Sequence, residues 1–241
     1  MSPVSIGISD RAHDAFDNLA KQECRERNLL AVVQQAHSLW DEDGRLRCGW
    51  AELMGETGVK TLELLEREGV LSTGGFVGID RDAARVERLR VEHPLRSWIA
   101  GDLLDSLRSP ELENVGVINF DAYDMVGTAS LMMTVRLLKT ITRRSVERFG
   151  AAVIFVNADL DAVRRRGLAC SHALRTHAEQ LARTLVDDGD RRRRLAATDL
   201  LPEGAEASVD DPAFLGQVGG VEIYRGKPGG HRMANLRVIL R

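Results

Sequence analysis

Short apolar runs alternate with helix-like patterns along most of the chain. From Leu46 onward, apolar runs bounded by Gly or Asp alternate with longer segments in which apolar residues recur every three or four positions. That alternation is typical of βαβ units and a parallel sheet. It predicts strands at 46–53, 75–79, 98–100, 115–120 and 151–156, and helices at 59–68, 82–92, 103–112, 129–149 and 161–186.

The two ends of the chain have different patterns. Residues 12–40 have apolar positions at helical spacing, among them Leu29, Leu30, Val33, Ala36 and Leu39, and predict one or two amphipathic helices. Near the other end, 218–224 and 233–240 read as strands.

Turn residues delimit these two end segments. Asp41-Glu-Asp-Gly44 separates the N-terminal helices from the first predicted strand, and Lys227-Pro-Gly-Gly230 joins the last two strands into a predicted antiparallel hairpin. We therefore expect an N-terminal helical extension over residues 1–45 and one α/β domain over 46–241. The expected fold class is α/β, with a doubly wound and mostly parallel sheet.

Composition agrees with an ordinary globular chain. With 44% hydrophobic and 29% charged residues, it is neither disordered nor collagen-like. No apolar stretch approaches the roughly 18 residues of a membrane-spanning helix, and the N-terminal sequence lacks the pattern of a secretory signal. A cytoplasmic location is the expectation. The cysteines Cys24, Cys48 and Cys170 fit neither a disulfide framework nor a zinc site, and the six histidines show no metal spacing, so no metal is expected.

The net charge of −3 gives no global argument for nucleic acid, but the charge is unevenly distributed. Between Arg136 and Arg194 there are fourteen Lys or Arg against seven Asp or Glu. This Arg-rich segment is able to track a phosphate backbone. The competing interpretation is that its arginines are solvated helix faces, which the scarcity of aromatic residues favours.

Acidic and glycine residues occur where the first three predicted strands end. Glu52 precedes a turn that contains Gly55 and Gly58, Asp80 ends the second strand, and Asp102 comes directly after the third. Ligands of open α/β sheets bind at such strand ends. Asp80 lies twenty-two residues after Gly58, and a carboxylate at that distance accepts hydrogen bonds from two ribose hydroxyls. The alternative is that Asp80 only caps the next helix.

This constellation resembles the class I S-adenosylmethionine-dependent methyltransferases, whose sheet also ends with an antiparallel strand. The resemblance implies S-adenosylmethionine as cofactor, with Gly55 and Gly58 permitting its close approach and Glu52 holding water or its amino group. It further implies that Asp102 accepts from the adenine amine while Leu103 packs on the ring. The glycine loop departs from the family's pattern, which has more glycines at closer spacing.

The fourth predicted strand leads into a polar loop. In the family this loop borders the methyl group and its acceptor, which makes Asn119, Asp121, Tyr123 and Asp124 the catalytic candidates. The prolines of the amino-methylating members are absent. An Asp such as Asp121 or Asp124 has the chemistry to act as base for a hydroxyl or ammonium acceptor. The alternative is that these side chains satisfy only the backbone of their own loop.

Two functions therefore compete on the sequence. One is a methyltransferase acting on nucleic acid or a small molecule, and the other is a methyltransferase-fold protein without catalysis that serves as a binding or structural component of a phage or mobile-element assembly. A nicotinamide oxidoreductase is disfavoured by the terminal hairpin and by the lack of a full Gly-x-Gly-x-x-Gly motif. A homo-oligomer is compatible with the sequence, which fixes neither the oligomeric state nor the methyl acceptor.

Overall fold

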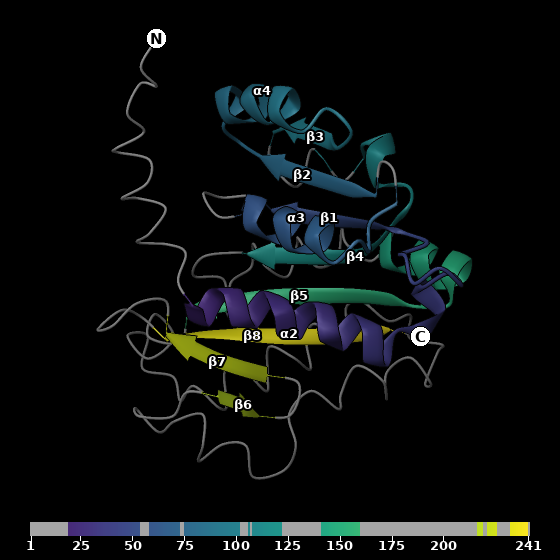
Figure 1. Cartoon of the computed structure of the whole chain (residues 1–241), viewed down its shortest axis with the longest axis vertical. Coiled ribbons are helices and arrows are strands. Elements are labelled where there is room, and N and C mark those ends of the chain that lie inside the picture. The colour runs from purple at the N-terminus through teal and green to yellow at the C-terminus, as the bar shows by residue number, and fades with distance from the viewer. Residues whose placement is uncertain are drawn as a thin grey trace.

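A computed structural model describes residues 19–53, 58–72, 75–101, 106, 108–121, 141–159, 216–218, 221–225 and 232–240. Within these residues eight strands form one sheet (Figure 1). The strands are β1 Gly49–Leu53, β2 Phe76–Asp80, β3 Ser97–Ala100, β4 Val115–Asp121, β5 Ala152–Asp159, β6 Gly216–Val218, β7 Val221–Arg225 and β8 Arg232–Leu240. The helices are α2 Leu19–Gln35, α3 Gly58–Arg67 and α4 Ala83–Glu92, with 3-10 turns η1 His37–Leu39 and η2 Pro110–Leu112, and 141–149 is also helical.

The sheet has the order β3-β2-β1-β4-β5-β8-β7-β6. The first five strands in this order pair in parallel, which confirms the predicted parallel sheet. β8 then runs antiparallel to β5, from Ala152 opposite Leu240 to Asp159 opposite Met233. β7 runs antiparallel to β8. An antiparallel strand inserted beside β5 distinguishes this sheet from the dinucleotide-binding order, in which the sixth strand continues in parallel.

Helices cover both faces of the sheet. Two residues of β4 at an odd separation show this: Asn119 faces α3, where it joins a network with Thr61, whereas Gly116 faces the helix 141–149. The chain order reverses between β1 and β4, which are neighbours in the sheet although β2 and β3 lie between them in sequence. The sheet is therefore doubly wound, and its topological switch point is the β1–β4 junction.

One apolar cluster joins α2 and α3 to the sheet. Trp50 of β1 stacks on Phe155 of β5 at 5.7 Å between ring centroids, and Val32 of α2 and Leu62 of α3 are fully buried in the same cluster. α2 lies beside α3 and contacts β7 and β8 (Figure 1). Side chains from before and after residue 45 thus share one core.

The buried face of α2 matches the apolar pattern of the sequence only in part. Of the apolar positions at helical spacing, Leu29, Ala36 and Leu39 are buried, whereas Leu30 is 49% exposed and Val33 is 41% exposed. The buried positions are spaced mainly by three or four residues and include a polar one. They are Cys24, Asn28, Leu29, Ala31 and Val32, and the buried Ala36 comes directly after the helix. Because the buried Asn28 is polar, a pattern of apolar residues alone does not identify this face.

Two predicted strand boundaries are also wrong. The first strand begins at Gly49 rather than at 46, because Leu46 makes an isolated bridge to Trp40. The predicted strand 218–224 is two strands, β6 and β7, with Val218 opposite Val221. The two residues between them in sequence are Gly-Gly, which suit a two-residue hairpin connection. Much of the predicted helices 103–112 and 129–149, and all of 161–186, lie outside the described residues.

Gly116 of β4 packs closely against Cys48 and Ser145. A Cβ added there would lie 2.6 Å from Cys48 Sγ and 2.8 Å from Ser145 Oγ, and 2.9 Å from Cys48 Cβ. Overpacking of this kind costs about 1–3 kcal/mol. We expect Gly116→Ala to lower the free energy of unfolding in urea by that amount. In Gly49→Ala, the added Cβ has 3.4 Å to its nearest atom, so that control should not lose stability. Equal urea midpoints for Gly116→Ala and the wild type would contradict this packing.

Cys48 is buried beside Gly116, and burial raises the pKa of its thiol to about 12. The thiolate is the reactive form, so this thiol stays protonated and inert across the neutral range. We expect iodoacetamide at pH 8 to label Cys48 only after denaturant is added. Mass spectrometry of the peptide that carries Cys48 measures this, and rapid labelling of that peptide in the native protein would show that the site opens.

Candidate functional site

Glu52 is the buried centre of the predicted cofactor edge. It is the next-to-last residue of β1, in register with Gly78 of β2 on one side and Asn119 of β4 on the other. Glu52 is only 4% exposed. A buried carboxylate is costly unless hydrogen-bond donors surround it, so its partners define the site.

Three uncharged donors from three elements reach this carboxylate. Trp50 Nε1 donates to Oε2 at 3.1 Å, Thr61 Oγ1 donates to Oε1 at 3.2 Å, and Asn119 Nδ2 donates to Oε1 at 2.7 Å. We call these four residues the Glu52 network. It joins β1, α3 and β4 at the switch point of the sheet.

Asn119 leaves one acceptor of the network unused. It is 6% exposed, and its Oδ1 atom is buried without a hydrogen-bond partner. The amide orientation follows from Glu52, because rotating the amide would place oxygen against the carboxylate instead of nitrogen. The amide nitrogen of Asn119 therefore donates within the Glu52 network, whereas its amide oxygen has no hydrogen-bond partner.

Asp80 ends β2 and is also engaged by its own chain. Its Oδ1 accepts from the backbone N–H of Asp82 at 2.9 Å, and its Oδ2 forms an ion pair with Arg85 Nη1 at 2.7 Å. The N-cap of α4 is Asp82, whose side chain accepts from the backbone N–H of Arg85. Asp80 is therefore not the N-cap residue of α4, although both of its carboxylate oxygens are bound by residues at the start of that helix.

The described residues bring part of the predicted site to one edge of the sheet. Glu52 and Asp80 lie at the carboxyl ends of the neighbouring strands β1 and β2, Asp121 ends β4, and the buried Gly58 begins α3. The other predicted site residues lie outside the described residues. These are Gly55, Asp102, Leu103, Tyr123 and Asp124.

Sequence reasoning missed three residues that hold these carboxylates, namely Trp50, Thr61 and Arg85. Trp50 had a signal, because it lies two positions before Glu52 and so on the same face of the strand. Thr61 lies on the α3 face that carries the buried Leu62 and Leu65. Arg85 had only its position in the first turn after Asp80.

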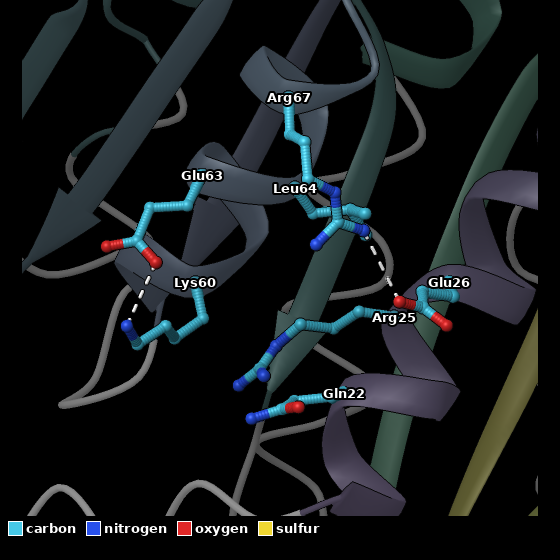
Figure 2. Close-up of a pocket in the computed structure, with 7 residues that line it drawn as sticks. All are labelled: Gln22, Arg25, Glu26, Lys60, Glu63, Leu64 and Arg67. Carbon is cyan, nitrogen blue, oxygen red and sulfur yellow. Dashed lines mark hydrogen bonds and ion pairs between the residues drawn. The ribbon is translucent and has the colours of Figure 1, made fainter.

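A groove of about 320 Å³ lies between α2 and α3 (Figure 2). Its lining is mostly charged and partly paired: Arg67 of α3 reaches Glu26 of α2 at 3.3 Å, and Lys60 pairs with Glu63 at 2.9 Å. Arg25 and Gln22 of α2 extend into the same space (Figure 2). None of the predicted site residues lines it, so the groove is distinct from the strand-end site.

The Arg-rich segment is described only over 141–159. There, Arg143 pairs with Glu147 at 2.9 Å, and Arg148 bonds Asn114 and lies over the ring of Phe149. These contacts fit helix-surface arginines. In the part of the chain that the structure describes, no helix has the length and apolar character to span a membrane.

Comparison with known proteins adds structural likenesses at low identity. No family model and no curated protein matches the sequence. The citrinin polyketide synthase CMeT domain has a TM-score of 0.49 and 16% identity over 96% of this chain, which spans 57% of that structure. The plantazolicin methyltransferase BamL has a TM-score of 0.46 and 11% identity, covering 96% of this chain and 95% of its own.

A third similar structure is the 16S rRNA (adenine(1408)-N(1))-methyltransferase from Catenulisporales acidiphilia. Its TM-score is 0.43 and its identity 9%, over 85% of this chain and 88% of that one. At such identities and TM-scores, the fold assignment rests on the strand order of this chain itself. With five parallel strands and an antiparallel strand beside the fifth, the chain has the α/β fold of class I methyltransferases.

Proposed function

We propose that the protein binds S-adenosylmethionine at the carboxyl ends of β1, β2 and β4 and transfers its methyl group to an acceptor. The observation that carries this proposal is the position of Glu52, Asp80 and Asp121 at the carboxyl ends of the adjacent strands β1, β2 and β4, beside the switch point of a sheet with this strand order. Ligands of open α/β sheets bind at that point because strand ends and helix N-termini converge there.

The residues present fit such a cofactor in two respects. Asp80 offers two carboxylate oxygens at the end of β2, the chemistry that two ribose hydroxyls require. The unpaired Oδ1 of Asn119 shows that the same edge holds a buried acceptor not satisfied by the chain. Gly58 at the start of α3 permits close approach of a ligand, and by the family resemblance Gly55, Asp102 and Leu103 complete the pocket.

When bound, the cofactor supplies an electrophilic methyl group on its sulfonium. The chain's part is to position the acceptor in line with that group and to exclude water. Asp121 ends β4 beside this edge, and we assign it the role of taking the proton of a hydroxyl or ammonium acceptor, with Tyr123 and Asp124 bordering the same site. A nucleic-acid acceptor would use the Arg-rich segment 136–194.

One observation favours a second candidate, a methyltransferase fold that binds or assembles without catalysis. Both carboxylates of the described cofactor edge are engaged by the chain itself: Glu52 by its network, and Asp80 by Asp82 and Arg85. A ribose that takes both oxygens of Asp80 has to displace the Arg85 guanidinium. Cofactor binding separates the two candidates.

Titration calorimetry with S-adenosylhomocysteine tests the proposed cofactor site. We expect the wild-type protein to bind this ligand and Asp80→Ala to weaken binding about tenfold or more, the worth of a hydrogen bond to a charged group. The matched control is Asp82→Ala, which removes the α4 cap two residues away and costs helix stability, but leaves the carboxylate of Asp80 in place.

Each result of the titration has one meaning. Absence of binding by the wild-type protein would refute the methyltransferase proposal and favour the non-catalytic candidate. Equal affinities of Asp80→Ala and the wild type would remove Asp80 from the site while leaving the cofactor proposal intact.

Asp121→Asn tests the acceptor side. Loss of a general base slows proton-coupled transfer by about 10²–10⁴-fold. We expect this variant to transfer labelled methyl from S-adenosylmethionine at least a hundredfold more slowly into whichever fraction the wild type labels, whether nucleic acid, protein or small molecules. Its calorimetric affinity for S-adenosylhomocysteine should match that of the wild type. Unchanged transfer would exclude Asp121 from the mechanism.

A further inference from the structure

The groove between α2 and α3 is lined mostly by charged side chains. Of the seven described residues that line its volume of about 320 Å³, three are basic and two are acidic. Only Leu64 among the seven is apolar, and it is buried. A cavity of this size holds a small molecule, and its lining favours a charged one.

The basic side chains of the groove come from both helices. Arg25 lies on α2, and Lys60 and Arg67 lie on α3. Arg25 and Lys60 are half-buried, whereas the acidic Glu26 and Glu63 are exposed. Figure 2 shows Arg25 extending away from α2 into the groove that Lys60 also lines. Because charges that are less accessible to water interact more strongly with a ligand, the groove favours an anion.

The ion pairs within the groove leave its basic groups able to bind a ligand. Lys60 Nζ lies 2.9 Å from Glu63 Oε2, with the two side chains 36% and 50% exposed, and Arg67 Nη2 lies 3.3 Å from Glu26 Oε1. Ion pairs as exposed as these are weak. The ammonium group of Lys60 has three N–H donors, of which Glu63 takes one. An anion can therefore bind Lys60 without displacing Glu63.

A phosphate monoester fits this set of donors. It has three terminal oxygens and a charge of about −1.5 to −2 at neutral pH, so one group can bind cations from both helices. A carboxylate has two oxygens and a single charge. A nucleic-acid backbone would bring further phosphates beside the exposed acids of α2 and α3, among them Glu26, Glu63 and Glu66, which repel them. The charges therefore favour one phosphate group on a small molecule.

The groove lies close to the edge that we propose binds the cofactor. α2 and α3 both begin on the side of the sheet where β2 and β4 end (Figure 1). Lys60 is in the first turn of α3, two residues after Gly58, and Arg25 is in the first two turns of α2. A methyl acceptor has to lie beside the cofactor for in-line transfer. A phosphate held by Lys60 would anchor such an acceptor at the start of α3.

We propose that the groove between α2 and α3 binds the phosphate group of a small methyl acceptor, with Arg25 and Lys60 as its main ligands. This inference rests on the proposed function, to which it adds the class of the acceptor. The groove binds and positions the acceptor, and the transfer itself takes place at the strand-end edge.

Calorimetric titration with inorganic phosphate tests the groove without the cofactor. We expect Lys60→Met and Arg25→Met each to weaken phosphate binding by at least about threefold, the worth of an exposed charged contact. Arg27→Met is the matched control, because Arg27 pairs with Glu23 on α2 and lies outside the described lining of the groove. It makes the same change in net charge and should alter the phosphate affinity by less than about 1.5-fold.

Glu63→Gln should act in the opposite direction. The substitution keeps the size of the side chain and removes the negative charge beside Lys60, so phosphate should bind about two- to threefold more tightly. Partial unfolding cannot produce such a gain, so this variant decides the matter even if a methionine variant is unstable. Unchanged or weaker binding by Glu63→Gln would contradict a phosphate at Lys60.

The labelled methyl product tests the class of the acceptor. With methyl-labelled S-adenosylmethionine, the wild type should label a small molecule that alkaline phosphatase converts to a less acidic form on an anion exchanger. Lys60→Met should need a higher concentration of that acceptor for half-maximal transfer, while its affinity for S-adenosylhomocysteine stays that of the wild type. A labelled nucleic acid, protein or phosphate-free molecule would refute the inference.

The outcomes separate this inference from the proposed function. A wild type that does not bind S-adenosylhomocysteine refutes the proposed function, and the acceptor role of the groove with it, even where phosphate binds. A wild type that binds S-adenosylhomocysteine but not phosphate refutes the inference alone. Equal phosphate affinities of Lys60→Met and Arg27→Met have the same meaning.

Discussion

A carboxylate buried between the strands of a sheet needs hydrogen-bond donors from the protein itself, because a buried charge without them is costly. For Glu52 these donors come from β1, α3 and β4, and leaving one of them out would cost several kcal/mol at so buried a group. The position of α3 relative to β4 is therefore set by hydrogen bonds as well as by the apolar cluster beneath. Since α3 also begins at the strand-end edge, the same constraint shapes the place where a ligand would bind.

The two carboxylates at this edge are held with different firmness. Trp50 both donates to Glu52 and stacks on Phe155, so the Glu52 network is continuous with the core. Asp80 pairs instead with Arg85, whose side chain is 24% exposed. The Asp80 side chain is itself only 9% exposed, so loss of Arg85 alone would leave that largely buried carboxylate short of a donor. Glu52 is thus held by uncharged donors of the core, and Asp80 by an ion pair within the start of α4.

The sequence predicts the parallel strands well because apolar runs that end in Asp or Gly are local signals. Phe76-Val-Gly-Ile-Asp80, for example, is a strand over all five residues. The partners of Glu52 were beyond such reasoning, because Asn119 is 67 residues away and meets it only through the β1–β4 register. The buried face of α2 follows the apolar pattern only in part, since Asn28 is buried there and Leu30 is not.

An amide and a carboxylate in register on adjacent parallel strands make a directional pair. Two carboxylates at 2.7 Å would repel, and an apolar residue at position 119 would leave Glu52 Oε1 one donor short. Asparagine meets both demands, because it donates on the side of Glu52 and accepts on the other. The buried Glu52 carboxylate accepts from side chains of the protein, whereas Asn119 on the adjacent strand presents a neutral acceptor at the same edge. The amide nitrogen of Asn119 thus contributes to holding β4 beside β1, while its oxygen has no hydrogen-bond partner in the part of the chain that the structure describes.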